Sequence, residues 1–262
     1  MRGIDRNLIK WIAMISMFID HAGFRLIIGD SGAPVYLRAV THILGRLAFP
    51  LFCFLLVDGF MRTRSKDKFF LRLLIWAIVS EIPYDLMVHG RVFYFNDQNV
   101  LWTLLFGFSF MWMADLIKSL DWYKEDKVSK TIGVLMQVIV GIIMVFAARF
   151  CKCDYGGAGV VFIILGYIFS DYSKKQPYIG PYKTMLFGYL IGYALLAIRY
   201  YSTIYAFPGA LLIWQYQGKA GKRMPRWLGY SFYPLHMTVI TAFAFVIHLA
   251  SGGAYGGRFA LY

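Results

Sequence analysis

Charged residues and cysteines are scarce in this chain of 262 residues. Only 16% of the residues are charged and 59% are hydrophobic, whereas a soluble domain is about a quarter charged and about half apolar. The three cysteines are too few for a disulfide-stapled module, and they lack the spacing of zinc ligands. These shortages exclude a soluble enzyme, a disordered chain and a small secreted domain.

In place of charge, the chain has long apolar windows. Hydropathy in windows of about 19 residues predicts roughly nine membrane spans. The predicted spans are 8–28, 38–60, 69–88, 99–117, 131–149, 156–171, 182–198, 202–217 and 227–250. Two of these, 156–171 and 202–217, are short for a hydrocarbon core about 30 Å thick. We therefore predict an all-α, polytopic integral membrane helix bundle, with residues 1–262 forming a single domain.

The basic residues are distributed unevenly between the two ends of these spans. Nineteen of the 27 Lys and Arg fall in segments on one side, seven fall on the other, and Arg46 lies inside a span. The positive-inside rule then predicts a cytoplasmic N-terminus and an external C-terminus in the plasma or inner membrane. The net charge of +13 is therefore interpreted as a topology signal and a contact with anionic lipid, not as a nucleic-acid site.

Ionisable residues inside the predicted spans are the main pointer to chemistry. They gather in the first three spans and the last, as Asp20, His21, Arg46, Asp58, Glu81, Asp85 and His236. A charge at the bilayer centre costs about 2.5–3.5 kcal/mol, so it requires a partner, a cavity or a function. The helical rise predicts that His21, Arg46, Glu81 and His236 lie at similar depth. They form either structural ion pairs or a reaction site.

Lys10 and His21 are eleven positions apart, which is nearly three helical turns. They are thus predicted to share one face, about 16 Å apart along the axis. An ammonium at the cytoplasmic mouth can hold a phosphate, and a pantetheine arm is of similar length to this spacing. The pair therefore indicates a site for acyl-CoA, although Lys10 alone is also explained as an ordinary flanking lysine.

Seven short motifs in this order resemble the TraX family of conjugation-associated membrane proteins. They are Phe18-Ile19-Asp20-His21, Gly45-Arg46-Leu47-Ala48-Phe49-Pro50-Leu51-Phe52, Asp58-Gly59-Phe60, Ser80-Glu81-Ile82-Pro83-Tyr84-Asp85-Leu86, Asn99-Val100-Leu101, Asp154-Tyr155-Gly156-Gly157 and Phe232-Tyr233-Pro234-Leu235-His236. The resemblance implies a membrane protein associated with N-terminal acetylation of pilin subunits. The basic residue, ten-residue gap and histidine also resemble the motif of the wider transmembrane acyltransferases, with Lys10 in place of their usual arginine.

Together, the residues and the resemblance predict acetyl transfer from cytosolic acetyl-CoA to an acceptor on the outer face. The acceptor is a peptide N-terminus, a glycan or a lipid headgroup. His21 is the predicted base, and Glu81 at matching depth is its predicted partner, because Asp20 is turned about 100° around the helix. Arg46 is expected to stabilise an oxyanion or neutralise a buried carboxylate. The remaining site residues are Lys10, Arg6 and Asp58 for the acyl donor, and Asp85, Asp154, Tyr233 and His236 for the acceptor side.

Two other classes of function remain open at this point. Buried Asp, His, Arg and Glu also form relays in proton-coupled transporters, but the chain shows no internal repeat of the kind that transporters carry. A non-catalytic membrane assembly protein is the other alternative. Binding of coenzyme A discriminates the acyltransferase from both.

Overall fold

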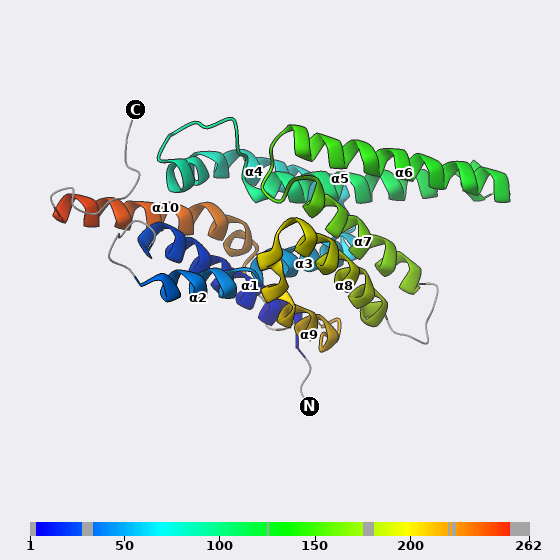
Figure 1. The fold of residues 1–262 in the computed structure, drawn as a ribbon. Coiled ribbons are helices and arrows are strands. Elements are labelled where there is room, and N and C mark those ends of the chain that lie inside the picture. The colour runs from blue at the N-terminus through cyan, green and yellow to red at the C-terminus, as the bar shows by residue number, and fades with distance from the viewer. Residues whose placement is uncertain are drawn as a thin grey trace. The chain divides into compact units, whose positions relative to one another are not determined.

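A computed structural model describes residues 4–27, 34–124, 126–174, 181–219, 221 and 224–251 (Figure 1). Within these ranges the chain folds into ten α-helices and no β-strand, which confirms the all-α prediction. A π-helical turn over Gly23–Ile27 and 3-10 turns over Asp121–Lys124 and Tyr201–Ala206 join some of the helices. The helices are α1 Arg6–Ala22, α2 Val35–Gly45, α3 Ala48–Arg62, α4 Lys66–His89, α5 Val100–Ser119, α6 Lys127–Phe150, α7 Gly156–Lys174, α8 Pro181–Arg199, α9 Pro208–Trp214 and α10 Arg226–Ala250.

The chain divides into two compact units. The first comprises Met1–Phe52, Ile78–Phe95 and Tyr200–Tyr262, and the second comprises Cys53–Ala77 and Asn96–Arg199. Helices α3 and α4 each contribute residues to both units. The predicted catalytic residues His21, Asp20, Arg46 and Glu81 all belong to the first unit.

Four helical stretches are long and apolar enough to cross a membrane, by length and composition. They are Tyr36–Arg62, Val100–Ser119, Lys127–Phe150 and Trp227–Ala250, and each overlaps one of the nine predicted spans. Two shorter apolar helices, Gly156–Asp171 and Met185–Arg199, overlap two more. The predicted span 202–217 contains only a 3-10 turn and the seven-residue α9, and a helix of that length rises only about 10 Å.

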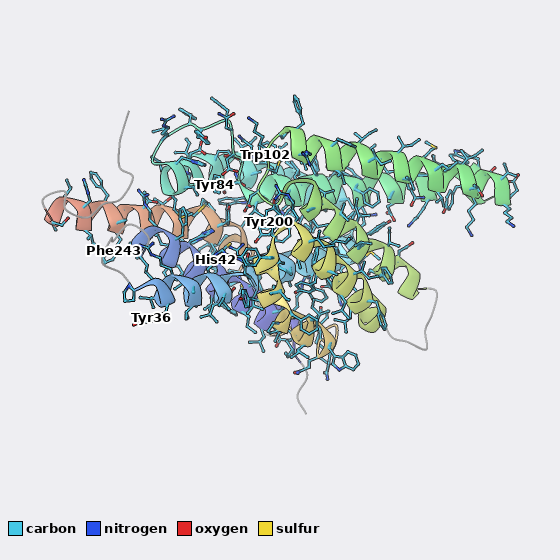
Figure 2. The ribbon with its side chains drawn as sticks, in the orientation of Figure 1. Tyr36, His42, Tyr84, Trp102, Tyr200 and Phe243 are labelled. Atoms are coloured by element: carbon cyan, nitrogen blue, oxygen red, sulfur yellow. The ribbon has the colours of Figure 1, made fainter. Side chains whose placement is uncertain are left out.

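Large apolar side chains remain exposed on these helices, as expected for surfaces that face lipid. Tyr36 on α2 is 70% exposed, Phe146 on α6 is 66% exposed and Phe243 on α10 is 56% exposed. Figure 2 shows Tyr36 and Phe243 projecting away from the neighbouring helices. Contiguous apolar exposure of this kind marks a membrane or protein contact, and it agrees with the length and hydropathy of the helices.

In the second unit, glycines allow α7 and α8 to approach closely. A Cβ atom added to Gly188 would lie 2.8 Å from the backbone oxygen of Leu165 on α7, and one added to Gly192 would lie 2.6 Å from the Phe162 ring. Gly188 and Gly192 are four residues apart and therefore lie on one face of α8. Small residues at this spacing are typical of tightly packed membrane helices.

In the first unit, α1 packs against both α2 and α10 at glycines. A side chain at Gly23 would overlap Thr41 on α2, and a side chain at Gly45 would overlap the Asp20 carboxylate. A side chain at Gly229 on α10 would overlap the ammonium of Lys10. These close approaches place two different faces of α1 against two different helices.

The start of α1 is fixed by its cap and by the segment that follows α9. Asp5 is the N-cap, and its side chain accepts a hydrogen bond from the Leu8 amide at 2.9 Å. Ile4 forms an isolated parallel bridge with Tyr216, and the Arg6 amide donates to the Lys219 carbonyl at 2.9 Å. The start of α1 is thereby held beside Tyr216 and Lys219.

Candidate functional site

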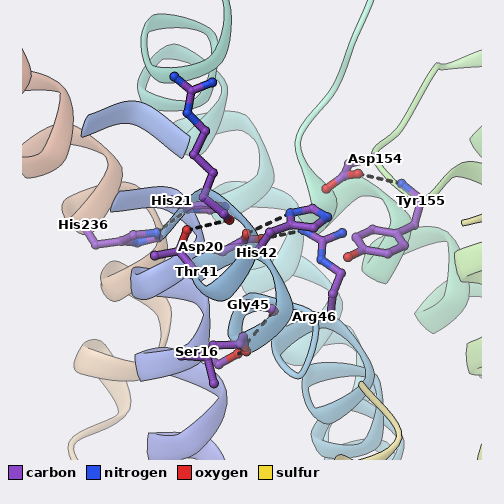
Figure 3. Close-up of polar contacts among 12 residues, drawn as sticks. Ser16, Asp20, His21, Thr41, His42, Gly45, Arg46, Asp154, Tyr155 and His236 are labelled. Atoms are coloured by element: carbon purple, nitrogen blue, oxygen red, sulfur yellow. Dashed lines mark hydrogen bonds and ion pairs between the residues drawn. The ribbon is translucent and has the colours of Figure 1, made fainter. Parts of the chain in front are cut away.

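His21 and His236 are hydrogen-bonded to each other. His21 lies one residue before the end of α1, and His236 lies in the middle of α10 (Figure 3). The distance between His21 Nδ1 and His236 Nε2 is 2.6 Å. The ring planes differ by 9° and the centroids are 4.9 Å apart. The centroid distance exceeds the N–N distance by roughly two ring radii, so the two nitrogens lie on the line that joins the ring centres. The imidazoles are therefore nearly coplanar and end to end, with one proton between the two nitrogens.

Aromatic side chains surround the imidazole pair. Phe232 stacks on His236, with centroids 4.9 Å apart and planes 13° apart. Tyr233 presents its ring edge-on to both imidazoles, 6.3 Å from His21 and 5.8 Å from His236. Phe18 approaches His236 at 6.5 Å. This apolar lining limits the ways in which the two rings can reorient.

His236 makes a second hydrogen bond, to its own helix. Its Nδ1 atom is 2.7 Å from the carbonyl oxygen of Phe232, one turn earlier on α10. The side chain is buried, with 5% of its surface exposed. Both ring nitrogens of His236 are therefore engaged, one by α10 itself and one by His21.

Asp20, the residue before His21, faces α2 rather than α10. Its Oδ2 atom accepts a hydrogen bond from Arg46 Nη2 at 2.5 Å, and its Oδ1 atom lies 3.4 Å from His42 Nδ1. Figure 3 shows the Asp20 carboxylate directed toward both of these side chains. Successive helical residues differ by about 100° in direction, which explains why neighbouring residues of α1 have partners on different helices.

The turn that separates α2 from α3 positions Arg46. The Ser16 hydroxyl on α1 donates to the carbonyl oxygens of Leu44 at 2.5 Å and Gly45 at 3.2 Å. These carbonyls lie at the end of α2, where the last C=O groups of a helix have no N–H partner within the helix. α1 therefore anchors the helix end that carries the guanidinium of Arg46.

Lys10 lies at the other end of the same face of α1. Its ammonium packs against the backbone of α10 at Gly229, and its side chain is partly buried. Over the described ranges around it, which omit 220 and 222–223, this ammonium has no hydrogen-bond acceptor or acidic partner. Arg6 precedes it by one turn, and Lys219 is hydrogen-bonded through its backbone to Arg6. Three basic residues are therefore near one another at this end of α1, and positive charge of this kind favours binding of an anion.

The structure places the other predicted residues as follows. Glu81 is partly buried on α4 in the first unit, and the Nδ1 atom of His21 is bonded to His236. The pairing of Glu81 with His21 stays a prediction. Asp85 is buried, and its carboxylate accepts a hydrogen bond from the Tyr94 amide at 2.8 Å. This hydrogen bond holds the loop that follows α4 against the end of that helix. Asp58 and Asp154 belong to the second unit, where each has its own partners.

Asp58 and Asp154 are each bound by residues of the second unit. Asp58 is buried and pairs with Arg62, one turn later on α3, at 2.8 Å. The Asp154 backbone pairs with Gln98 and with the Thr103 hydroxyl. Both aspartates therefore have local structural partners. Their predicted donor and acceptor roles stay predictions.

Three residues of this site had no predicted role of their own: His42, Phe232 and Gly229. His42 precedes Arg46 by four residues, so helical periodicity alone places both side chains on one face. Phe232 precedes His236 by the same interval and supplies a carbonyl, which no sequence pattern marks. Gly229 gave no signal, because a single glycine in an apolar helix is common.

Comparison with known proteins places these observations in a family. The chain is 26% identical, over 247 residues, to the probable fimbrial assembly protein FimC, serogroup H1, of Dichelobacter nodosus. The alignment covers 88% of this chain and 92% of that protein. No solved structure matches the chain. A family model described as TraX protein matches residues 5–244, where all of the predicted site residues lie, and the chain therefore belongs to the TraX family.

Proposed function

We propose that the protein is a membrane acyltransferase that moves an acetyl or other short acyl group from acyl-CoA to an amine or hydroxyl acceptor. The observation that carries this proposal is the α10-facing side of α1. That side holds the Lys10 ammonium against Gly229 at one end and the His21 imidazole against His236 at the other. One face thus combines an anion-binding group with a base.

The spacing on this face suits a long, thin donor. Lys10 and His21 are eleven positions apart on the helix, which corresponds to about 16 Å. The pantetheine arm of coenzyme A is of similar length, so a phosphate held at Lys10 brings the thioester to His21. Arg6 and Lys219 add positive charge at the phosphate end, where three phosphate groups require it.

The chemistry needs a base and a group that orients it. His21 takes the proton of the acceptor amine or hydroxyl as the acceptor attacks the thioester. Arg46 is bound to Asp20 at 2.5 Å, so we assign it to neutralising that carboxylate and holding α2 against α1. Coenzyme A itself supplies the activated thioester.

We further propose that the chain crosses the inner membrane several times, with its N-terminus in the cytoplasm and its C-terminus outside. Support comes from the bias of Lys and Arg, from four helices of sufficient length and from two shorter apolar helices. In this topology the Lys10 end faces cytosolic acyl-CoA and the acceptor approaches from the outer face. The printed name of the Dichelobacter relative suggests a fimbrial subunit as the acceptor, with its N-terminal amine as the acylated group.

The test uses purified protein in detergent and in vesicles. Calorimetry with coenzyme A should detect binding that Lys10→Ala weakens, while Lys127→Ala, at the exposed start of α6, removes the same charge with no effect. With labelled acetyl-CoA, transfer to amine-bearing peptides should fall ~10²-fold or more in His21→Ala, and His248→Ala should retain it. Absence of both coenzyme A binding and acyl transfer in the wild-type protein would refute the proposal.

The relative's printed name also favours a second candidate, a non-catalytic membrane protein of fimbrial assembly. Such a protein requires a surface for other subunits but no base and no donor site. Complementation of a deletion strain separates the two candidates. Loss of fimbriae in a deletion strain, restored equally by wild type and His21→Ala, would support the non-catalytic candidate.

A further inference from the structure

The hydrogen bonds of His236 determine where the protons of both imidazoles lie. A carbonyl oxygen only accepts, so the 2.7 Å contact to Phe232 requires a proton on His236 Nδ1. A neutral imidazole carries one N–H, and His236 Nε2 is therefore an acceptor. The proton in the 2.6 Å contact then belongs to His21 Nδ1. His21 Nε2 is left with a lone pair.

We propose that His236 is a positioning residue that holds His21 in the Nδ1–H tautomer and makes Nε2 the basic atom of the site. The proposal deepens the proposed acyl transfer and rests on it for the role of Nε2. It also moves His236 from the acceptor side, where the sequence analysis put it, to the support of the base. The chain of hydrogen bonds runs from His21 through His236 to the backbone of α10.

His236 is well placed to fix a tautomer because its own orientation is fixed twice. The Phe232 carbonyl holds Nδ1, and the Phe232 ring stacks on the imidazole at 4.9 Å. The ring cannot flip without breaking the bond to its own helix and losing the one to His21. A flip would also expose a buried N–H to an apolar lining, which costs free energy.

No carboxylate is needed for this arrangement. In serine hydrolases an aspartate accepts the Nδ1 proton of the catalytic histidine and sets its tautomer. Here the adjacent carboxylate, Asp20, is directed to Arg46 and His42 on the other side of α1. A neutral imidazole, His236, takes the acceptor position instead. It fixes geometry without placing a negative charge beside the base.

The proton balance of the proposed reaction then runs through one atom. The acceptor's N–H or O–H bond breaks, the proton moves to His21 Nε2, and an electron pair of the acceptor atom forms the bond to the thioester carbon while the C=O π pair moves onto oxygen. The carbon–sulfur bond then breaks as that pair returns to re-form the carbonyl, and the departing thiolate takes the proton from Nε2. While His21 is positively charged, its Nδ1–H stays bonded to His236, which spreads the charge over a polarisable ring.

The tautomer can be measured without turnover. Nitrogen-15 solid-state NMR on histidine-labelled protein in bilayers resolves five histidines at most, and His21→Asn identifies the His21 signals. We expect a protonated Nδ1 and an unprotonated Nε2 at His21 in the wild type. His236→Phe should shift His21 toward the Nε2–H form. An Nε2–H tautomer at His21 in the wild type would overturn the proposal, whether or not any variant folds.

Kinetics supply the second readout, and variants separate hydrogen bonding from packing. His236→Phe keeps an aromatic ring and removes the acceptor, so kcat should fall ~10²-fold or more with the donor KM within about twofold. His236→Gln provides an amide oxygen that can accept the hydrogen bond from His21 Nδ1–H. Its kcat should be at least about tenfold higher than that of His236→Phe. Phe232→Leu removes the stacked ring, keeps the carbonyl and should lower kcat least.

Two outcomes would contradict the positioning role. Equal loss in His236→Phe and His236→Gln would assign His236 to packing, and wild-type turnover in His236→Phe would remove it from the reaction. If wild-type protein transfers no acyl group but shows the expected tautomer, the proposed function fails and the assigned proton positions stand. The two failures are therefore distinguishable.

Discussion

The ion pair between Asp20 and Arg46 gives the most direct test of how α1 and α2 are held together. Both side chains are largely buried, 16% and 17% exposed, and the N–O distance is 2.5 Å. Replacing Arg46 with Met leaves the Asp20 carboxylate with His42, which lies at 3.4 Å and is half exposed. A hydrogen bond to a charged group contributes about 1.5–3 kcal/mol. We expect Arg46→Met to lower the free energy of unfolding by that amount.

This loss is smaller than the roughly 3–5 kcal/mol typical of breaking a fully buried ion pair. The difference arises because partial exposure lets water solvate the remaining carboxylate. A double-mutant cycle isolates the interaction. Asp20→Asn keeps the side-chain shape and removes the charge, so the double variant should be more stable than the sum of the single losses predicts, by about 1–2 kcal/mol. Equilibrium unfolding in mixed micelles of increasing SDS fraction provides the measurement.

The control for this cycle is the Lys118–Asp171 pair of the second unit, whose atoms are 2.7 Å apart and whose side chains are 24% and 22% exposed. Combining Asp20→Asn with Lys118→Met should give losses that add to within about 0.5 kcal/mol. Strict additivity of Asp20→Asn and Arg46→Met would refute the reasoning, because it would show that the close contact contributes nothing to the folded state.

Three further predictions follow from single positions. Gly229→Ala should displace the Lys10 ammonium and raise the donor KM without lowering kcat in acyl-transfer assays; an unchanged KM would contradict this. Gly188→Val on α8 should lower the SDS fraction of half-unfolding by steric overlap with α7, whereas an unchanged midpoint would show that the helices shift freely. The Ser129 amide lowers the pKa of Asp126, the N-cap of α6. Asp126 therefore stabilises α6 at pH values above its unfolded pKa, and this stabilisation is lost as the pH falls through the folded pKa. In Asp126→Ala, the hydrogen-exchange protection factors of the first turn of α6 should no longer decrease over this acidic range; an unchanged decrease would contradict the role of the cap.

Helical class was predictable because apolar windows leave few alternatives. In a membrane every backbone donor must be paired inside its own segment, so long apolar runs become helices. The direction of Asp20 relative to His21 was also predictable, since 100° per residue separates their partners. Gly45 and Pro50 mark the region of the break at Arg46, but such residues also kink a continuous transmembrane helix, so they do not by themselves predict a turn.

The hydrogen bond between His21 and His236 could not be predicted from the sequence. Hydropathy and helical rise give the level of a residue in the membrane, and Glu81 and His236 both fall near that of His21. They do not give the rotation of α10 about its axis, which decides whether His236 or a neighbouring residue faces α1. That rotation depends on close contacts such as the one between Lys10 and Gly229, which one sequence does not reveal.

The first unit is assembled from pieces that leave the ribosome at very different times. Asp20, Arg46 and their helices are synthesised early and can form their ion pair while the rest of the chain is still being made. His21 must wait for His236, which follows it by 215 residues, and the whole second unit is translated in between. The imidazole pair is therefore among the last contacts that biogenesis can complete, and a chain halted before α10 carries the base without the residue that orients it.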